Sequence, residues 1–277
     1  MFITRFAPSP TGPLHLGHAF SAMLAHDMAR SANGTFLLRI DDLDETRSRP
    51  EWEQQICDDL TWLGLSWPTP VLHQSKRLPR YRKALTTLWA QGLLYPCSCS
   101  RRDIRAAASA PQEGAPLHGP DGVIYPGTCR PDKLPKGPMP QDIALRLDMT
   151  RACATLDEPL TYVEKGEFIT PRDLPATVGD VVLARRDMGA SYHLSVVLDD
   201  ADQTITHVIR GQDLQGATQI HVLLQRLLGL PTPDYHHHRL IRDDHGKRLA
   251  KRDDSRAIAT YRADGASPQD IRELVGL

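Results

Sequence analysis

The chain opens with alternating short apolar segments and a stretch of helical spacing. Residues 2–7 are mostly apolar, and the prolines and glycine of residues 8–13 exclude regular structure after them. The next apolar residues share one face of a predicted helix: Leu16, Phe20, Met23, Leu24 and Met28. Asn33 and Gly34 supply a stop, and residues 36–40 form a short apolar run typical of a buried strand. This order predicts a βαβ unit and therefore a parallel sheet.

Two further helices are predicted over residues 51–63 and 80–91. Residues 96–170 are rich in Pro, Gly and Ala with little periodicity, and we interpret them as an inserted lobe. Regular patterns then return, with strands expected at 180–184, 191–198 and 207–209 and helices at 219–228, 255–262 and 267–277. The predicted division is a split α/β domain (1–95 and 171–245), the lobe (96–170) and a C-terminal end (246–277).

Composition narrows the class of protein. The 277 residues have ordinary apolar and charged fractions, which favours a globular protein. No apolar run approaches the ~20 residues of a membrane span, and the N-terminus does not resemble a signal peptide, so we expect a cytoplasmic protein. The net charge of −1 indicates no global attraction to polyanions. Arginine-rich segments at 101–105, 239–252 and 256–262 could form local basic patches; the alternative is scattered, solvated surface charge.

The loop between the first strand and the first helix carries the strongest chemical signal. His15 and His18 are three residues apart at a predicted helix N-terminus, where backbone N–H groups and the helix dipole favour anions. Both imidazoles would face one side and reach phosphate oxygens together. Gly17 would let a nucleotide base approach the helix closely.

Cysteine and histidine clusters suggest one metal site. The count of five cysteines is odd and does not fit a secreted disulfide framework. Three of them lie in the lobe, one ligand short of a tetrahedral zinc site: Cys97, Cys99 and Cys129. On ligand chemistry alone His118 is a candidate for the fourth position. Cys57 and Cys153 are expected to pack as small hydrophobic residues, and the run 236–238 of three histidines is interpreted as structural, because consecutive side chains point in different directions.

Residues 5–18 resemble the HIGH signature of class I aminoacyl-tRNA synthetases, in the form found in glutamyl enzymes. Residues 5–12 read R-F-A-P-S-P-T-G, and Ala7 and Ser9 differ from the P-P-E-P-N-G version of glutaminyl enzymes. The resemblance implies a Rossmann-like catalytic domain in which His15, Gly17 and His18 bind ATP. In this family the two histidines stabilise the ATP phosphates while a carboxylate attacks the α-phosphate. ATP is then a substrate, with Mg²⁺ expected beside it.

A second segment, residues 247–252, resembles the mobile KMSKS loop of the same family. Lys251 is implied to be the catalytic lysine that meets charge on the phosphates, and Arg248 to contact ATP. Arg248 stands where the family has lysine and Ala250 where it has serine. These departures are expected to change the rate and to leave the type of reaction unchanged.

The resemblance also implies a glutamate site. Arg210 lies in a segment similar to the family's V-x-R-G-x-D element, and Tyr192 in one similar to its Y-x-[LF]-[AS]-x-V-x-D-D element, taken as a strand. Guanidinium groups are natural partners of carboxylates. Asp41 stands where the family usually has Glu to hold the α-amino group. The implied glutamate-binding residues are Arg5, Phe6, Ala7, Pro8, Ser9, Asp41, Tyr192 and Arg210.

In the lobe, C-x-C followed by Y-x-x-x-C is similar to the zinc site of the same synthetase group. That resemblance implies one structural Zn²⁺ bound by Cys97, Cys99, Tyr125 and Cys129. The alternative is a set of reduced cysteines without metal, since some members of the family lack the site.

The predicted signature loop is followed by only about 25 residues, which leaves no room for an anticodon-binding domain. This arrangement resembles the glutamyl-Q tRNA(Asp) synthetases, a group within the family. Membership would imply activation of glutamate without tRNA, then transfer of glutamate to queuosine in the anticodon loop of tRNA(Asp), by a monomer. Three alternatives stay open: a minimal glutamyl-tRNA synthetase that charges a 3′ end, a related nucleotidyltransferase, and a catalytically inactive RNA-binding paralogue.

Overall fold

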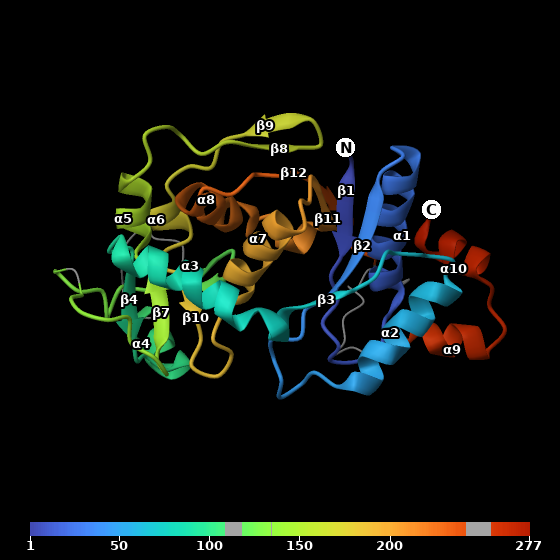
Figure 1. The fold of residues 1–277 in the computed structure, drawn as a ribbon, viewed down its shortest axis with the longest axis horizontal. Coiled ribbons are helices and arrows are strands. Elements are labelled where there is room, and N and C mark those ends of the chain that lie inside the picture. Colours follow the sequence, from blue (N-terminus) through green and yellow to red (C-terminus); the bar gives the residue numbers. More distant parts are fainter. Residues whose placement is uncertain (109–117, 134, 242–255) are drawn as a thin grey trace. The chain divides into compact units, whose positions relative to one another are not determined.

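The computed structural model describes residues 1–108, 118–133, 135–241 and 256–277. These residues form two compact units, coloured along the chain in Figure 1. The first unit contains residues 1–76, 204–213 and 233–277, and the second contains 77–203 and 214–232. None of the helices in the described part of the chain combines the length and the apolar character that a membrane crossing needs.

The first unit is built on parallel strands, as the βαβ pattern predicts. Strands β1 (Ile3–Phe6), β2 (Thr35–Ile40) and β3 (Leu72–His73) pair in the order β1-β2-β3, each pair parallel. Strands β11 (His207–Gly211) and β12 (Asp234–His238) form a second parallel pair. β11 starts beside β1, where the Thr206 N–H donates to the Ile3 carbonyl at 2.9 Å. The parallel sheet is therefore confirmed.

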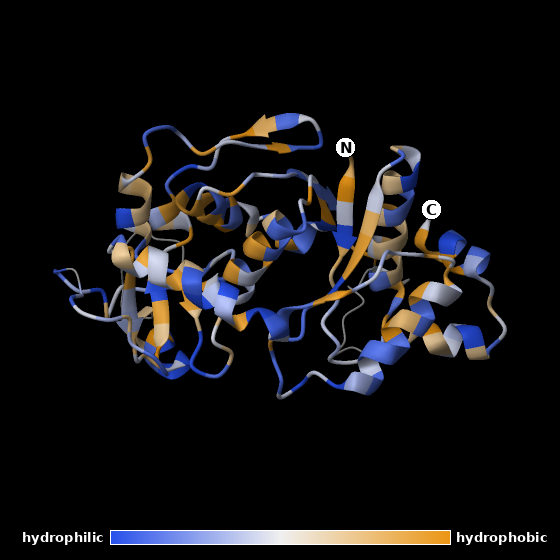
Figure 2. Cartoon of the chain, in the orientation of Figure 1, coloured by the Kyte–Doolittle hydropathy of each residue, from blue (hydrophilic) through white to orange (hydrophobic). Residues whose placement is uncertain are grey.

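Helix α1 (Leu16–Ser31) buries its apolar face in the core of this unit, as predicted. Asn33 ends it with a positive φ of 48°, and Gly34 is required because a Cβ there would lie 2.1 Å from the Phe2 carbonyl oxygen. Figure 2 shows mainly hydrophobic residues along β2, both hydrophobic and hydrophilic positions along β1, and mixed colouring on the outer helices. The remaining elements of this unit are α2 (Pro50–Trp62), α9 (Ile258–Ala263) and α10 (Pro268–Val275).

The second unit contains an antiparallel sheet, two hairpins and six helices among its described residues. The sheet has the order β10-β7-β4, from β4 (Leu94–Cys97), β7 (Ala144–Leu147) and β10 (Val182–Ala184). The hairpins are β5 (His118–Gly119) with β6 (Gly122–Val123), and β8 (Tyr162–Glu164) with β9 (Glu167–Ile169). The helices are α3 (Leu78–Ala90), α4 (Arg101–Ala108), α5 (Met149–Ala154), α6 (Leu174–Thr177), α7 (Tyr192–Asp202) and α8 (Thr218–Leu228). Two short 3-10 turns, Gln74–Arg77 and Gln212–Leu214, stand at the changes from one unit to the other.

The predicted strand at 191–198 is wrong, because these residues begin helix α7. The Ser191 hydroxyl caps the helix by accepting the Leu194 N–H, and residues 193–200 are all buried. A short apolar run that is buried on every side has no polar face, so its periodicity does not separate strand from helix. The other predicted elements outside the lobe agree with the structure to within a few residues at each end. The division into a split domain with a lobe at 96–170 stays a prediction.

Candidate active site

His15 and His18 form a locked pair at the start of α1. His15 is the N-cap residue, and its Nδ1 accepts the Gly17 N–H at 3.1 Å. The Nδ1 of His18 accepts the His15 N–H at 3.2 Å, and the two rings stack with centroids 3.7 Å apart. A neutral imidazole whose Nδ1 accepts a hydrogen bond carries its proton on Nε2. The backbone therefore sets both rings in the same tautomer, with Nε2–H as the donor.

Gly17 favours this arrangement. A Cβ on Gly17 would lie 3.0 Å from Cε1 and 3.2 Å from Nδ1 of His15, which is closer than such contacts normally are. The missing side chain thus makes room for the His15 ring over the first turn. The predicted role of Gly17 in admitting a nucleotide base stays a prediction.

The loop before α1 is held by backbone bonds to the segment after β2. The Pro8 carbonyl accepts the Asp41 N–H at 3.0 Å, and the Pro10 carbonyl accepts the Arg49 N–H at 3.0 Å. The implied glutamate-binding residues of this loop differ in exposure: Arg5, Phe6 and Pro8 are buried, Ala7 is half-buried and Ser9 is exposed.

Asp41 is paired within the first unit. Its Oδ1 accepts the Arg39 Nε–H at 2.7 Å, and Arg39 is fully buried on β2. Asp41 is half-buried, and this ion pair fixes the position of its carboxylate. The structure therefore presents Asp41 as an oriented anion, which suits an ammonium partner, although its role toward glutamate stays a prediction.

Arg210 is buried on β11, and the neighbouring strand positions it. Its Nε–H donates to Nε2 of His237 at 3.1 Å, across the register that pairs Arg210 with His237. The guanidinium also lies over the Tyr235 ring, with 5.3 Å between the Arg210 Cζ and the ring centroid. Within the histidine run 236–238, His237 thus contacts an implied binding residue, while His238 packs edge-on against Phe20.

The segment with Arg248, Ala250 and Lys251 lies outside the described residues. After this segment the chain pairs with the residues just before α1, because Ala257 and His15 form an antiparallel bridge. The Ile258 N–H donates to the Leu14 carbonyl at 2.9 Å.

Tyr192 belongs to the second unit, whereas Arg5, Asp41 and Arg210 belong to the first. It is the first residue of α7 and is 38% exposed. Its ring contacts those of His193 and His221 edge-on, with both centroid distances 5.7 Å. The Tyr192 ring thus packs against two histidine rings and remains partly accessible to solvent.

The implied zinc ligands converge in the second unit. The Sγ atoms of Cys97, Cys99 and Cys129 lie within 4.8 Å of one another. The Tyr125 hydroxyl is 3.5 Å from the Cys97 Sγ and 3.4 Å from the Cys99 Sγ. For a tetrahedral zinc with normal bond lengths, ligand oxygen and sulfur atoms are about 3.5 Å apart. The donor set therefore fits a zinc ion; His118 is exposed on β5 and is not part of the cluster.

Electrostatics also favour a cation at this cluster. The hydrogen bond from Tyr125 lowers the pKa of the Cys129 thiol, which favours the thiolate form that a zinc ion binds. The Arg146 Nε–H donates to the Cys97 Sγ at 3.3 Å, and its guanidinium lies over the Tyr125 ring at 3.8 Å from the centroid. Arg146 thus compensates negative sulfur and stacks on the remaining ligand.

Sequence reasoning missed the residues that position others. Arg39, His237 and Arg146 contact Asp41, Arg210 and Cys97, respectively. The only signal for them was an arginine or histidine at a strand position that should be apolar. Such a residue is buried only when a partner satisfies it, which is a reason to look for that partner.

The whole chain, residues 1–277, matches the family model described as tRNA synthetases class I (E and Q), catalytic domain. A protein from Rhodobacter capsulatus named glutamyl-Q tRNA(Asp) synthetase is 65% identical over 99% of the chain and 100% of that protein. A protein of the same name from Symbiobacterium thermophilum is 42% identical over 98% of the chain and 84% of its own length.

Two solved structures resemble the fold over 100% of the chain. A glutamate tRNA ligase from Elizabethkingia meningosepticum, crystallised with its amino acid, has a TM-score of 0.74 at 26% identity. Glutamate-tRNA synthetase from Elizabethkingia anophelis has a TM-score of 0.75 at 25% identity. The chain spans 60% and 61% of the length of these two proteins.

Proposed function

The chain belongs to the class I tRNA synthetase family of the glutamate and glutamine (E and Q) type, and on this basis we propose that it is a glutamyl-Q tRNA(Asp) synthetase. It would activate glutamate with ATP in the absence of tRNA and transfer the glutamyl group to queuosine at the wobble position of tRNA(Asp). The proposed activation of glutamate rests mainly on the stacked pair of His15 and His18. Both rings are held in one tautomer, at the point where helix α1 follows a parallel strand.

In the first step a glutamate carboxylate oxygen bonds to the α-phosphorus, and the bond from that phosphorus to the bridging oxygen breaks, releasing pyrophosphate. Negative charge spreads over the phosphate oxygens during this exchange. The Nε2–H groups of His15 and His18 are donors already oriented by the backbone, and the start of α1 adds its dipole. ATP is a substrate here and is expected to bind with Mg²⁺.

Lys251 is proposed to complete this stabilisation, with Arg248 as a second contact to ATP. Lys251 precedes Ala257 by six residues, a chain length that spans at most about 21 Å. Ala257 is bridged to His15, and this short connection along the chain supports the assignment of the loop to the ATP phosphates.

For the amino acid, we propose that Arg210 and Arg5 bind carboxylates and that Asp41 binds the α-amino group. Arg210 and Asp41 are each held by a neighbour, His237 and Arg39. Preoriented charges lose less entropy when the substrate binds. Phe6, Ala7, Pro8, Ser9 and Tyr192 are proposed to complete the surface around glutamate.

A structural zinc ion is proposed at Cys97, Cys99, Tyr125 and Cys129. It would link the end of β4 to the loop at 125–129, in a segment with few regular elements of its own. The catalytic steps do not use it.

The acceptor is tested by transfer of labelled glutamate to tRNA(Asp) with and without queuosine. Label only on the queuosine-containing RNA, lost when the anticodon loop is cut away, is the expected result. Label on the 3′ end would instead make the protein a minimal glutamyl-tRNA synthetase. RNA binding without activation of glutamate would indicate an inactive paralogue.

A further inference from the structure

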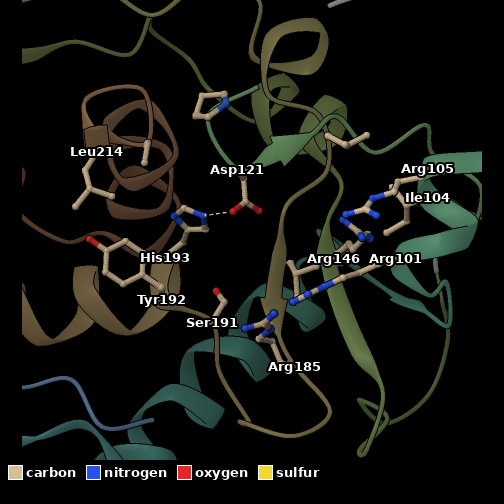
Figure 3. A pocket seen from close by; sticks show the side chains of 14 residues that line it. Arg101, Ile104, Arg105, Asp121, Arg146, Arg185, Ser191, Tyr192, His193 and Leu214 are labelled. Atoms are coloured by element: carbon tan, nitrogen blue, oxygen red, sulfur yellow. Dashed lines mark ion pairs between the residues drawn. The ribbon is translucent and has the colours of Figure 1, made fainter. Parts of the chain in front are cut away.

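The second unit contains a cavity of about 560 Å³ whose chemistry the proposed activation step does not use, apart from Tyr192. This volume is in the range of cavities that hold small ligands. In Figure 3, Arg101, Ile104, Arg105 and Arg146 gather on one side, and Tyr192, His193 and Leu214 on the other. The cavity therefore has a cationic wall and an aromatic wall.

Three of the arginines that line the cavity form no ion pair among the described residues. Arg101 and Arg105 are exposed on α4 and form no ion pair within the described chain. Arg185 is also exposed, and its side chain donates a hydrogen bond to the Met188 sulfur at 3.5 Å. A fourth arginine, Arg146, is engaged with Cys97 and the Asp180 carbonyl. Three guanidinium groups thus line a cavity whose one lining carboxylate, Asp121, is paired with His193 and with none of these arginines.

The cationic wall is produced by helical spacing. Arg101, Ile104 and Arg105 stand at positions i, i+3 and i+4 of α4 and all line the cavity. Arg102 and Asp103 do not line it, and Asp103 instead accepts the Ser100 N–H and hydroxyl at the start of the helix. The helix therefore directs like charges, which repel one another, toward the same space.

The opposite wall has a different chemistry. Asp121 accepts from Nε2 of His193 at 3.1 Å, and Nδ1 of His193 lies 3.1 Å from Nε2 of the buried His221. Tyr192 offers an accessible ring beside them. An anionic ligand is repelled by Asp121 and attracted by the arginines, so the cavity orients a molecule that has a phosphate at one end and a ring at the other.

We propose that this cavity binds a nucleotide of the RNA acceptor, with its phosphodiester on Arg101, Arg105 and Arg185 and its base or sugar against Tyr192. The proposal rests on the proposed function insofar as the acceptor is an RNA. Arginine is suited to phosphate by its fork of N–H donors, and aromatic rings stack on splayed bases.

A free nucleotide such as ATP offers the same chemistry, but RNA is favoured. The three arginines are exposed side chains beside an open cavity, and no glycine is among the residues that line it, so no glycine-rich loop encloses a triphosphate there. The ATP phosphates are moreover assigned to the histidine pair of the first unit. An RNA backbone presents a row of phosphates that such a surface can follow.

The test uses the full chain with Arg101 and Arg105 both changed to Ala, and Arg102→Ala on the other face of α4 as the matched control. Binding of queuosine-containing tRNA(Asp) is measured at several salt concentrations, and glutamate-dependent ATP–pyrophosphate exchange is measured without RNA. We expect the double variant to bind the RNA at least roughly 10-fold more weakly. The slope of log K for binding against the logarithm of the salt concentration should decrease in magnitude by about 2. Exchange should stay within about twofold of the unaltered protein, and Arg102→Ala should behave normally.

Unchanged RNA affinity and salt slope in the double variant would overturn the proposal. A raised KM for ATP with unaltered RNA binding would assign the cavity to a free nucleotide and also overturn it. Failure of the proposed function is distinguishable, because the unaltered protein would then not glutamylate queuosine. Loss of RNA affinity in the double variant would support the cavity assignment even in that case.

Discussion

At the scale of single residues, hydrogen bonds to the backbone define the chemistry of the two histidines. Because each Nδ1 accepts an N–H of the first turn, rotation of either ring would leave a backbone donor without its acceptor. The two side chains therefore act as one rigid donor pair. The sequence indicates the pair and its helix, but the tautomer follows only from the observed contacts.

Gly17→Ala tests this rigidity. The new methyl group must displace the His15 ring by a few tenths of an ångström, which weakens its bond to the residue-17 N–H. We expect the rate of adenylate formation to fall roughly 10-fold or more with the KM for glutamate little changed, because geometry of the transition state is lost. The melting temperature should not fall, since alanine favours the helix. Ser21→Ala on the same helix is the control, and a normal rate for Gly17→Ala would refute the role given to the glycine.

Asp59 gives a prediction about pH. It is fully buried on α2 with Arg262 of α9 at 3.3 Å, and burial raises its pKa to about 6. A folded-state pKa above the unfolded value of 3.8 means that folding favours the protonated form. The contribution of protonated Asp59 to stability is complete below about pH 4 and is lost as the pH rises through about 6. The free energy of unfolding falls by at most about 3 kcal/mol over this range.

The stability of Asp59→Asn, compared with that of the unaltered protein at the same pH, should therefore be higher at pH 7.5 than at pH 4.5. Thermal unfolding of both proteins at the two pH values measures this, because other titrating groups cancel in the difference. A stability difference that does not vary with pH would show that Asp59 keeps its ordinary pKa.

At the scale of elements, prediction succeeded where the hydrophobic pattern had a polar counterpart. β1, α1 and β2 were predictable because α1 has one apolar face and its ends carry stop signals. The mostly apolar run at 191–198 favours a strand in the sequence, but it forms a helix whose continuous burial leaves no polar face to mark the helical period. The contact between Arg210 and His237 joins residues 27 positions apart on two paired strands. The register of that pairing cannot be predicted from the sequence of either strand alone.

The metal cluster is tested with Cys99→Ser. We expect the purified protein to contain about one zinc per chain and the variant to contain clearly less, since a thiolate is the stronger zinc ligand. Elemental analysis gives the readout independently of activity. Cys57→Ser is the control, because Cys57 packs against the core of the first unit. Absence of metal from both the unaltered protein and the variant would remove the zinc site from the account.

At the scale of the whole molecule, the implied functions are distributed over both units. The histidine pair, Arg210 and Asp41 belong to the first, while Tyr192, the cysteine cluster and the arginine-lined cavity belong to the second. The proposed phosphate-activating centre and the proposed RNA-binding surface thus lie in different units, so variants in one should leave the other intact. The residues proposed for the first centre come from the family signature in the sequence, whereas the cavity depends on helix spacing and loops that meet only in the fold.

The most direct test is ATP–pyrophosphate exchange by the purified protein with glutamate and without any RNA, beside Lys251→Ala. The account predicts exchange with glutamate and little with aspartate or glutamine. It also predicts a loss of a few orders of magnitude in Lys251→Ala with glutamate binding largely retained, because the lysine meets charge in the transition state. Exchange that appears only when tRNA is added, or no exchange at all, would contradict it.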